Sequence, residues 1–225
     1  MKKRLMVALV VMSMTVAGLT ACGGSGTTET AAETAAETEA IPEYERGTST
    51  ETGWESAWIG MKFTAGEGVV MQDEEAMDAI LEAGSEEMGN DPADFEGLYT
   101  YEMMASDGTM GLPQVAMLVE QSDLTPDEYI DQMLEQLEAA FTAVGDNQDA
   151  STSIEMTQDG DVTDYELAGL TFRRLQMKAS SQGFDMIQDY LICRRGDYLI
   201  EIISTALADQ AEERDAMMAC FTALE

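Results

Sequence analysis

A run without large apolar side chains divides this 225-residue chain and limits the part of it that can fold. Residues 29–40 read Glu-Thr-Ala-Ala, Glu-Thr-Ala-Ala and Glu-Thr-Glu-Ala, and residues 23–26 before them read Gly-Gly-Ser-Gly. A segment of this composition cannot bury enough apolar surface to offset the entropy that is lost on ordering. We therefore expect residues 22–52 to form a flexible tether and residues 53–225 to form a single domain, because about 175 residues usually build one core.

Residues 1–21 have the composition of a secretion signal, with a basic start, an apolar middle and an exit of small residues. The apolar part is shorter than the roughly 20 residues that cross the hydrocarbon core, so we expect a signal rather than a membrane span. The signal ends in Leu19-Thr20-Ala21-Cys22, and Gly23 follows. This motif resembles the lipobox of bacterial lipoproteins, in which the cysteine thiol carries a diacylglycerol and the signal is cut off before the cysteine.

The resemblance implies that Cys22 is lipidated and is the first residue of a chain anchored at the extracytoplasmic face of the cell membrane. More than one acyl chain makes such an anchor stable, since each buried methylene adds about 0.8 kcal/mol. The alternative is an ordinary cleaved signal in which the cysteine has no role.

The chain is strongly acidic, with 44 Asp and Glu against 11 Lys and Arg and a formal net charge of -33. Three of the basic residues lie in the signal, so the mature chain carries 8 minus 44, or -36. This charge repels nucleic-acid phosphates, and we expect no nucleic-acid partner. The chain has no histidine, which excludes Ser-His and Cys-His nucleophile pairs and histidine-bound metals. We therefore expect no enzyme activity and no cofactor.

Hydrophobic patterns from residue 54 onward predict strands and helices in a definite order. We expect strands at residues 58–63 and 69–71 as a hairpin, a helix at 73–84, strands at 98–105 and 112–119, a helix at 125–145, strands at 162–167, 170–178, 184–194 and 198–204, and a helix at 209–224. The clearest signal is the capping box Thr125-Pro126-Asp127-Glu128 of the second helix. The order predicts an α+β fold, an antiparallel β-sheet meander flanked by about three α-helices as an α/β/α sandwich.

The order of elements also resembles the PsbP-like fold, which photosystem extrinsic subunits, the Ran-binding nuclear import factor and many bacterial lipoproteins share. The local motifs that carry the resemblance are Glu128-Tyr129, Leu167-Ala168-Gly169, Gln188-Asp189-Tyr190 and Arg195-Gly196-Asp197-Tyr198. The resemblance covers roughly residues 54–225. It implies a binding or assembly factor without catalysis, and it transfers no functional residue.

Basic side chains of the mature chain gather on two adjacent predicted strands, at Arg173, Arg174, Lys178, Arg194 and Arg195. With a turn centred on residues 181–182, Arg174 faces Asp189 and Lys178 faces Asp185. One interpretation is simple pairing of surface charges. The other is a partner patch of the four arginines that binds an acidic ligand or partner through guanidinium forks, with Glu201 as a candidate internal counterion.

Two further groups of residues leave alternatives open. Asp159, Asp161 and Asp164 place oxygen ligands around a turn as a calcium site would, but the spacing departs from the EF-hand pattern, and the alternative is a solvated turn between strands. We expect no bound metal. Cys193 lies on a predicted strand and Cys220 on the apolar face of the last predicted helix. Outside the cytoplasm they can form a disulfide, and the alternative is two buried thiols.

These features predict a lipid-anchored extracytoplasmic lipoprotein whose domain is a non-catalytic binding or assembly module at the cell envelope, with an envelope protein as partner. The alternative is a small-ligand-binding lipoprotein for uptake or sensing. A carboxylate-based hydrolase is the third hypothesis, although no acidic pair stands out in the sequence. A deep pocket with polar groups would favour a ligand binder, and a flat apolar patch would favour an assembly factor.

Replacing Cys22 with Ser should remove the lipid attachment, because the thiol is the acylated group in a lipobox. We expect the variant to leave the detergent phase in a detergent-partitioning experiment, or to stay uncleaved in the membrane fraction. Ser25→Ala, which lies just beyond the motif, is the control and should partition as the unchanged protein does. Unaltered partitioning and processing of the Cys22→Ser variant would contradict lipidation.

Overall fold

The computed structural model describes residues 43–87, 99–108, 111–145, 154–181 and 184–224. Within these ranges the chain forms twelve strands and three helices. The strands are β1 (Thr48–Thr50), β2 (Gly53–Ser56), β3 (Met61–Thr64), β4 (Val69–Met71), β5 (Tyr99–Asp107), β6 (Gln114–Gln121), β7 (Ile154–Gln158), β8 (Thr163–Leu167), β9 (Leu170–Ser181), β10 (Phe184–Arg195), β11 (Tyr198–Leu207) and β12 (Phe221–Ala223). The helices are α2 (Glu74–Glu87), α3 (Pro126–Gly145) and α4 (Ala211–Met218). In the part of the chain that is described, we find no helix whose length and hydropathy would let it cross a bilayer.

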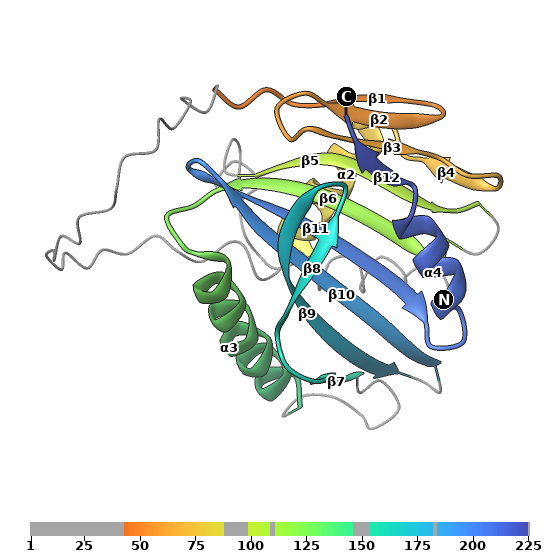
Figure 1. The fold of residues 1–225 in the computed structure, drawn as a ribbon. Coiled ribbons are helices and arrows are strands. Elements are labelled where there is room, and N and C mark those ends of the chain that lie inside the picture. Colours follow the sequence, from red (N-terminus) through yellow and green to blue (C-terminus); the bar gives the residue numbers. More distant parts are fainter. Residues whose placement is uncertain (1–42, 88–98, 109–110, 146–153, 182–183, 225) are drawn as a thin grey trace, which may run out of the picture.

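Two antiparallel sheets form the body of the domain (Figure 1). The large sheet has the strand order β4-β5-β6-β11-β10-β9-β7, and β8 also pairs with β9. The small sheet has the order β1-β2-β3-β12. Helices α2 and α3 pack on one face of the large sheet, whereas the small sheet and α4 pack on the other. The α+β class is compatible with this arrangement, but the domain is richer in β-structure than the expected α/β/α sandwich because a second sheet covers one face.

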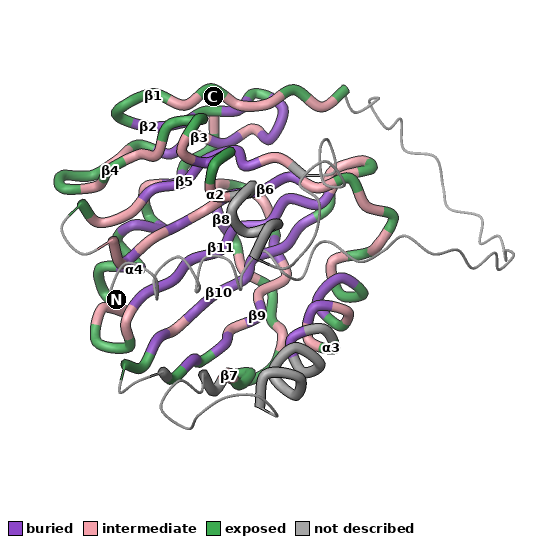
Figure 2. Tube along the Cα trace, turned by 180° about the vertical axis from the view of Figure 1, so that it is seen from behind, coloured by how far each residue is buried: buried purple, intermediate pink, exposed green. Residues whose placement is uncertain are grey.

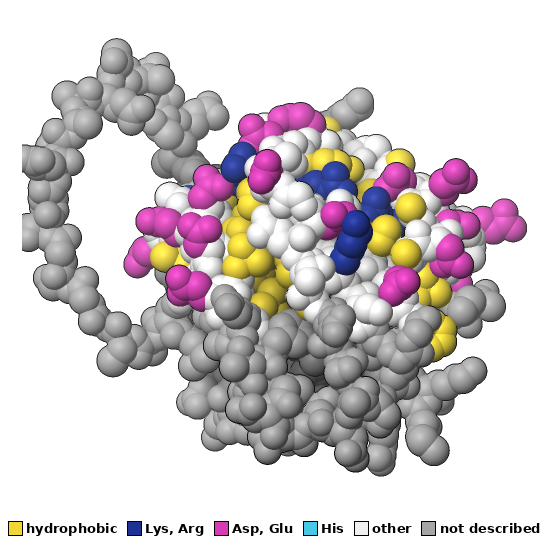
Figure 3. All heavy atoms as spheres, turned by 90° about the horizontal axis from the view of Figure 1, so that it is seen from below, with side chains coloured by type: hydrophobic (Ala, Val, Ile, Leu, Met, Phe, Trp, Pro, Cys, Tyr) yellow, Lys and Arg dark blue, Asp and Glu magenta, His cyan; other side chains and the backbone are white. Residues whose placement is uncertain are grey.

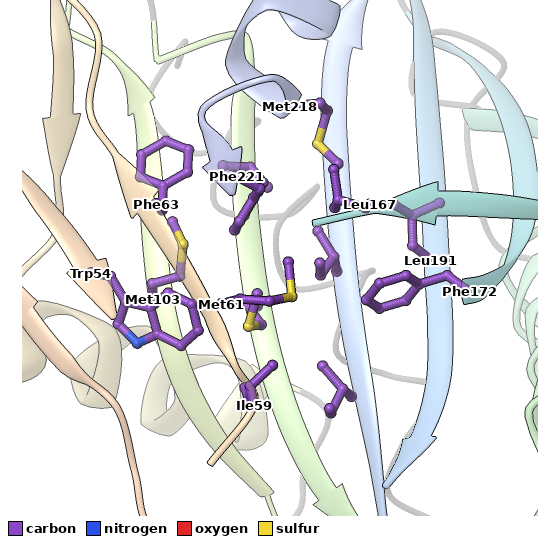
Figure 4. Close-up of a cluster of buried hydrophobic side chains, with 14 of the residues drawn as sticks. Trp54, Ile59, Met61, Phe63, Met103, Leu167, Phe172, Leu191, Met218 and Phe221 are labelled. Carbon is purple, nitrogen blue, oxygen red and sulfur yellow. The ribbon is translucent and has the colours of Figure 1, made fainter. Parts of the chain in front are cut away.

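Apolar side chains cover both faces of the large sheet. Figure 2 accordingly colours much of its central strands as buried. The sheet core lies between the two sheets and includes Trp54, Met61, Phe63, Met103 and Phe221 (Figure 4). The helix core lies under α2 and α3 and includes Met77, Tyr129, Met133, Tyr190 and Ile203. Strands β10 and β11 contribute to both cores, which explains their nearly continuous apolar runs.

Most of the predicted elements are confirmed. Helices α2 and α3, the β5–β6 pair and the meander from β8 to β11 lie close to their predicted ranges. The capping box is confirmed as well, because the backbone N–H of Glu128 donates to Oγ1 of Thr125 at 3.3 Å. The backbone N–H of Thr125 in turn donates to Oε2 of Glu128 at 2.8 Å. These two hydrogen bonds satisfy donors that a helix start leaves unpaired.

Two predicted elements are wrong. The last helix ends at Met218, and Phe221–Ala223 form β12 beside β3. The ring of Phe221 packs on that of Phe63 with centroids 4.9 Å apart, so burial in the sheet core outweighs the helical spacing of the sequence. The predicted hairpin at residues 58–71 is also wrong, because β3 pairs with β2 and β12 whereas β4 joins the large sheet beside β5.

An N-terminal strap, residues 43–50, lies against the domain although we expected these residues to belong to the tether. Its strand β1 pairs with β2. Glu102, which is only 1% exposed, accepts hydrogen bonds from the hydroxyl of Tyr44 at 2.6 Å and from the backbone N–H of Gly47 at 2.8 Å. It also accepts one from Nε1 of Trp54 at 3.1 Å. The folded domain therefore begins before residue 53, the expected start.

Further contacts fix the position of the strap. Arg46 donates from Nε and Nη2 to the carbonyl of Tyr101 at 3.1 and 2.7 Å, and its Nη1 forms an ion pair with Glu74. A Cβ atom at Gly47 would come within 2.4 Å of Nε1 of Trp54, so only glycine fits there without movement of the indole. The strap is therefore an ordered part of the folded domain.

A chain that begins at residue 53 should melt at a lower temperature than one that begins at residue 43, because buried Glu102 then loses two of its three donors. An unpaired buried polar group costs about 1–3 kcal/mol, which is roughly 2–12 °C in Tm for a domain of this size. A chain that begins at residue 23 should have the same Tm as the chain that begins at residue 43, since residues 23–40 contain no large apolar side chain. Equal Tm values for all three chains, measured by circular dichroism, would show that the strap adds no stability.

Candidate functional site

The predicted partner patch does not form one surface. Its members are Arg173, Arg174, Arg194 and Arg195. Neighbouring residues of a strand point to opposite faces of a sheet, so the pairs are split. On the α3 face, Nε of Arg173 donates to Asp127 at 2.8 Å, and Nη1 of Arg194 donates to the carbonyl of Leu124 at 2.6 Å. On the other face, Arg174 contacts Asp189, and the guanidinium of Arg195 lies 5.5 Å from the ring centre of Trp58.

The register of β9 and β10 differs from the predicted one by two residues, so each side chain keeps its face. Arg174 therefore does not face Asp189 directly, but its Nη2 reaches Oδ2 of Asp189 diagonally at 2.9 Å. Lys178 pairs with Asp159 at 2.9 Å rather than with Asp185. One of the two predicted ion pairs is confirmed, and the other has a different partner.

The best-defined polar site surrounds Asp189, which is 6% exposed. Its Oδ2 accepts from Nη2 of Arg174, and its Oδ1 accepts from Nε2 of Gln176 at 2.8 Å. Nη1 of Arg214, from α4, lies 3.2 Å from the same Oδ2. Ser204 of β11 stands directly opposite Asp189 in the strand register. We refer to these five residues as the arginine cluster.

Packing in the sheet core places the arginine cluster. Met217 and Met218 of α4 are buried in that core, which turns Arg214 toward the sheet. The side chain of Arg214 is 9% exposed. The guanidinium of Arg174 lies 5.4 Å from the ring centre of Tyr165, a cation–π contact that holds it in place. The cluster thus joins three strands and one helix.

Three polar atoms of the arginine cluster are buried without a hydrogen-bond partner in the described part of the chain. They are Nε of Arg174, Nη1 of Arg214 and Oγ of Ser204. Nη1 of Arg214 has its ion pair with Asp189, but that contact does not have hydrogen-bond geometry. Buried polar atoms in native proteins are nearly always hydrogen-bonded, so three such atoms around one carboxylate make this cluster the candidate binding site.

Some of the basic side chains gather on one face of the molecular surface. Figure 3 shows Lys and Arg side chains near the middle of one face, with Asp and Glu side chains among and around them. In a chain with a net charge of -33, such a position is locally less negative than the rest of the surface.

The other residues singled out in the sequence have separate places. Cys22 lies outside the described residues. Asp159 and Asp164 pair with Lys178 and Arg173, and in the described ranges no group of three or more His, Cys, Asp or Glu is arranged to hold a metal ion.

The two remaining cysteines are both free thiols in this structure. Cys193 is buried in the sheet core, and burial raises the pKa of its thiol to about 12. Cys220 is partly buried beside a groove of about 460 Å³ between α4 and the β3–β4 turn. Val69, Leu112, Pro113 and Met217 give the groove apolar walls, and Glu67, Asp107 and Glu213 line it as well.

Glu120 and Glu201 form an acidic pair in the helix core that the sequence alone did not reveal. The hydroxyl of Tyr129, in α3, lies 3.1 Å from Oε2 of Glu120 and 3.5 Å from Oε2 of Glu201. Glu201 does not neutralise Arg174 or Arg195, as a counterion of the partner patch would, because it lies on the α3 face. The sequence could have pointed to Glu201, because it is an acid inside the apolar run of β11. No local pattern connects Glu201 with Glu120.

One hydroxyl hydrogen cannot serve two carboxylates, and within the described residues neither carboxylate has an ion pair. Burial, together with the nearby charge of Glu120, raises the pKa of Glu201 to about 8. Burial likewise raises the pKa of Glu120 to about 7. At neutral pH the pair therefore keeps a proton, which lets the two carboxyl groups share the tyrosine hydroxyl.

No protein-family model matches the sequence, and no curated protein matches it. Among solved structures, the chain is similar to the solution structure of the cyanobacterial PsbP protein CyanoP from Synechocystis sp. PCC 6803, with 9% identity and a TM-score of 0.43 over 80% of this chain and 98% of that one. It is also similar to LpqN, a protein involved in cell envelope biogenesis of Mycobacterium tuberculosis, with 11% identity and a TM-score of 0.36 over 56% of this chain and 78% of that one. Likeness at such TM-scores is too distant to carry an argument about function.

Acidification should stabilise the protein through the Glu120–Glu201 pair. The pKa of Glu201 is raised from its ordinary 4.5 to about 8 by folding. Its contribution to stability is therefore fully present below pH 4.5 and is lost as the pH rises through 8. We expect Tm to fall between pH 6 and pH 9, and we expect this fall to be smaller in the Glu201→Gln variant.

Loss of net charge also stabilises an acidic protein at low pH, so a matched variant is needed. Glu135→Gln removes one charge from the exposed surface of α3 and should keep the pH dependence of the unchanged protein. The same pH dependence of Tm in both variants would contradict a proton-sharing pair.

Proposed function

We propose that this protein is a lipid-anchored extracytoplasmic lipoprotein with a PsbP-like domain, and that the domain binds an envelope protein without catalysing a reaction. The binding surface in this proposal is the arginine-cluster face, formed by α4 and by the adjoining parts of β9, β10 and β11. The PsbP-like assignment rests on the order of elements and on the local motifs of the sequence.

The observation that carries the binding role is the set of unpartnered polar atoms in the arginine cluster. A purely structural ion pair is stable when its donors and acceptors are all satisfied. Here Arg174, Arg214 and Ser204 keep polar atoms without a partner in the described chain. A partner group that reaches these atoms by displacing a neighbouring side chain would gain hydrogen bonds at little further cost in desolvation, because the protein has already removed the atoms from water.

The envelope location rests on the N-terminal sequence. A lipidated Cys22 would be joined to the domain by a tether of at most about twenty residues, since Tyr44 and Gly47 of the strap already bind Glu102. Twenty residues of flexible chain have a root-mean-square reach of roughly 25 Å. The domain would then work within a short distance of the membrane surface, where an envelope partner lies.

Two observations support a role without catalysis. The sequence contains no histidine, the usual general base near neutral pH. The acidic pair that could serve a hydrolase lies in the helix core, with Glu201 only 8% exposed beneath Tyr129. A catalytic carboxyl group has to reach the atoms of its substrate.

The groove beside Cys220 favours a second candidate, the small-ligand-binding lipoprotein. Its volume of about 460 Å³ falls in the range of small-molecule sites. In that case the ligand would contact Met217 and Pro113, and no protein partner would be needed.

Photo-crosslinking from the intact protein in its own membrane tests the proposed binding face. A photoreactive residue at Glu212, which is exposed on α4, should give one discrete protein adduct. The same residue at Asp131, which is exposed on α3 on the opposite face of the large sheet, is the control and should give none. Absence of adducts at both positions would favour the small-ligand candidate, and equal adducts at both would contradict a defined binding face.

A further inference from the structure

We infer that the arginine cluster is a carboxylate-binding site, and that Asp215 occupies the ligand position in the free protein. This inference rests on the proposed function, because it names the chemical group that the binding face recognises. The expected ligand group is a side-chain or terminal carboxylate of the partner.

The first step of the argument is the excess of positive charge. Nη2 of Arg174 and Nη1 of Arg214 lie 2.9 and 3.2 Å from the same oxygen atom, Oδ2 of Asp189. Two guanidinium groups thus converge on one carboxylate that is 6% exposed. The side chain of Arg214 is 9% exposed and that of Arg174 is 25% exposed, so the charge of Arg214 in particular needs a second anion to balance it.

In the free protein the second anion is Asp215. Its Oδ1 accepts from Nε of Arg214 at 3.2 Å and from Nη2 at 2.9 Å. Both bonds go to one oxygen atom, so Asp215 does not make the two parallel bonds by which a guanidinium holds a carboxylate most strongly. Consecutive residues of a helix also do not face each other, so Asp215 reaches its neighbour in poor geometry.

Exposure shows that Asp215 is replaceable. Its side chain is 71% exposed, whereas the side chain of Arg214 is 9% exposed. An exposed carboxylate in a surface ion pair contributes little to stability and can turn to solvent at small cost. The fork of Arg214 that Asp215 covers is then available to a carboxylate that approaches from outside.

The unpartnered polar atoms favour the same ligand. Nε of Arg174 and Oγ of Ser204 come from two different strands and lie beside Asp189 without hydrogen bonds in the described chain. Tyr165 lies 5.4 Å under the guanidinium of Arg174, so this donor is already oriented. A planar carboxylate matches guanidinium forks, and the presence of Asp215 shows that the position takes this group.

The test measures binding of succinate to the mature protein, residues 22–225, with Cys22→Ser in every sample so that no lipid is present. Arginine Nε–H signals in NMR spectra are followed at constant ionic strength. Asp215→Asn removes the internal carboxylate, and we expect it to tighten succinate binding roughly two- to fivefold, as the loss of a competing surface pair implies. The signals of Arg174 and Arg214 should shift.

Asp131→Asn is the matched control, because Asp131 is exposed on α3, on the opposite face of the large sheet, and the chemical change is identical. We expect its affinity to equal that of the unchanged protein. Arg174→Lys keeps the positive charge but removes the fork, and it should abolish the gain that Asp215→Asn gives. Equal affinities of the Asp215→Asn and Asp131→Asn variants, or no shift of the Arg214 signal at saturating succinate, would overturn the inference.

Two further outcomes separate the ligand classes and the two proposals. Tighter binding of inorganic phosphate than of succinate would overturn the assignment to carboxylates. A protein adduct at Glu212 without succinate binding would leave the proposed function standing and overturn the carboxylate site. Succinate binding without any adduct would support the site and contradict the protein partner.

Discussion

Burial of the large sheet on both of its faces is the constraint on which the rest of this structure depends. The small sheet and α4 cover one face, and α2 and α3 cover the other, so no side chain in the middle of β10 or β11 reaches water easily. A polar group in such a strand has to be paired or has to lose its charge. The notable residues of this domain are the places where the sequence puts an acid into that environment.

Three buried acids meet this constraint in three different ways. Glu102 is held by neutral donors from the strap and from Trp54, although burial still raises its pKa. Glu201 keeps a proton and shares a tyrosine hydroxyl with Glu120. Asp189 is matched by two arginines, which is one cation more than its own charge requires. Only the third arrangement needs a second acid, the exposed Asp215, to balance it, and it is the one for which we propose a ligand.

Local signals in the sequence predicted the elements that local interactions determine. The capping box at Thr125 defined α3, and short turns between apolar runs defined the meander from β8 to β11. Tertiary contacts decided the rest. Phe221 belongs to a strand because Phe63 lies beside it, and the strap folds because Glu102 accepts its hydrogen bonds. Strand alternation in the sequence could have separated Arg173 from Arg174, but no pattern shows that α4 brings Arg214 to Asp189.

The small sheet joins the two ends of the domain. Its order β1-β2-β3-β12 places the last strand against one of the first, with residue 63 paired to residue 221. The chain between these residues loses conformational entropy before the contact contributes any stability. Long-range strand pairing of this kind therefore slows folding. The sheet core can therefore close only after β12 has joined β3, and a chain without β12 would leave the side of Phe63 that Phe221 covers open to water.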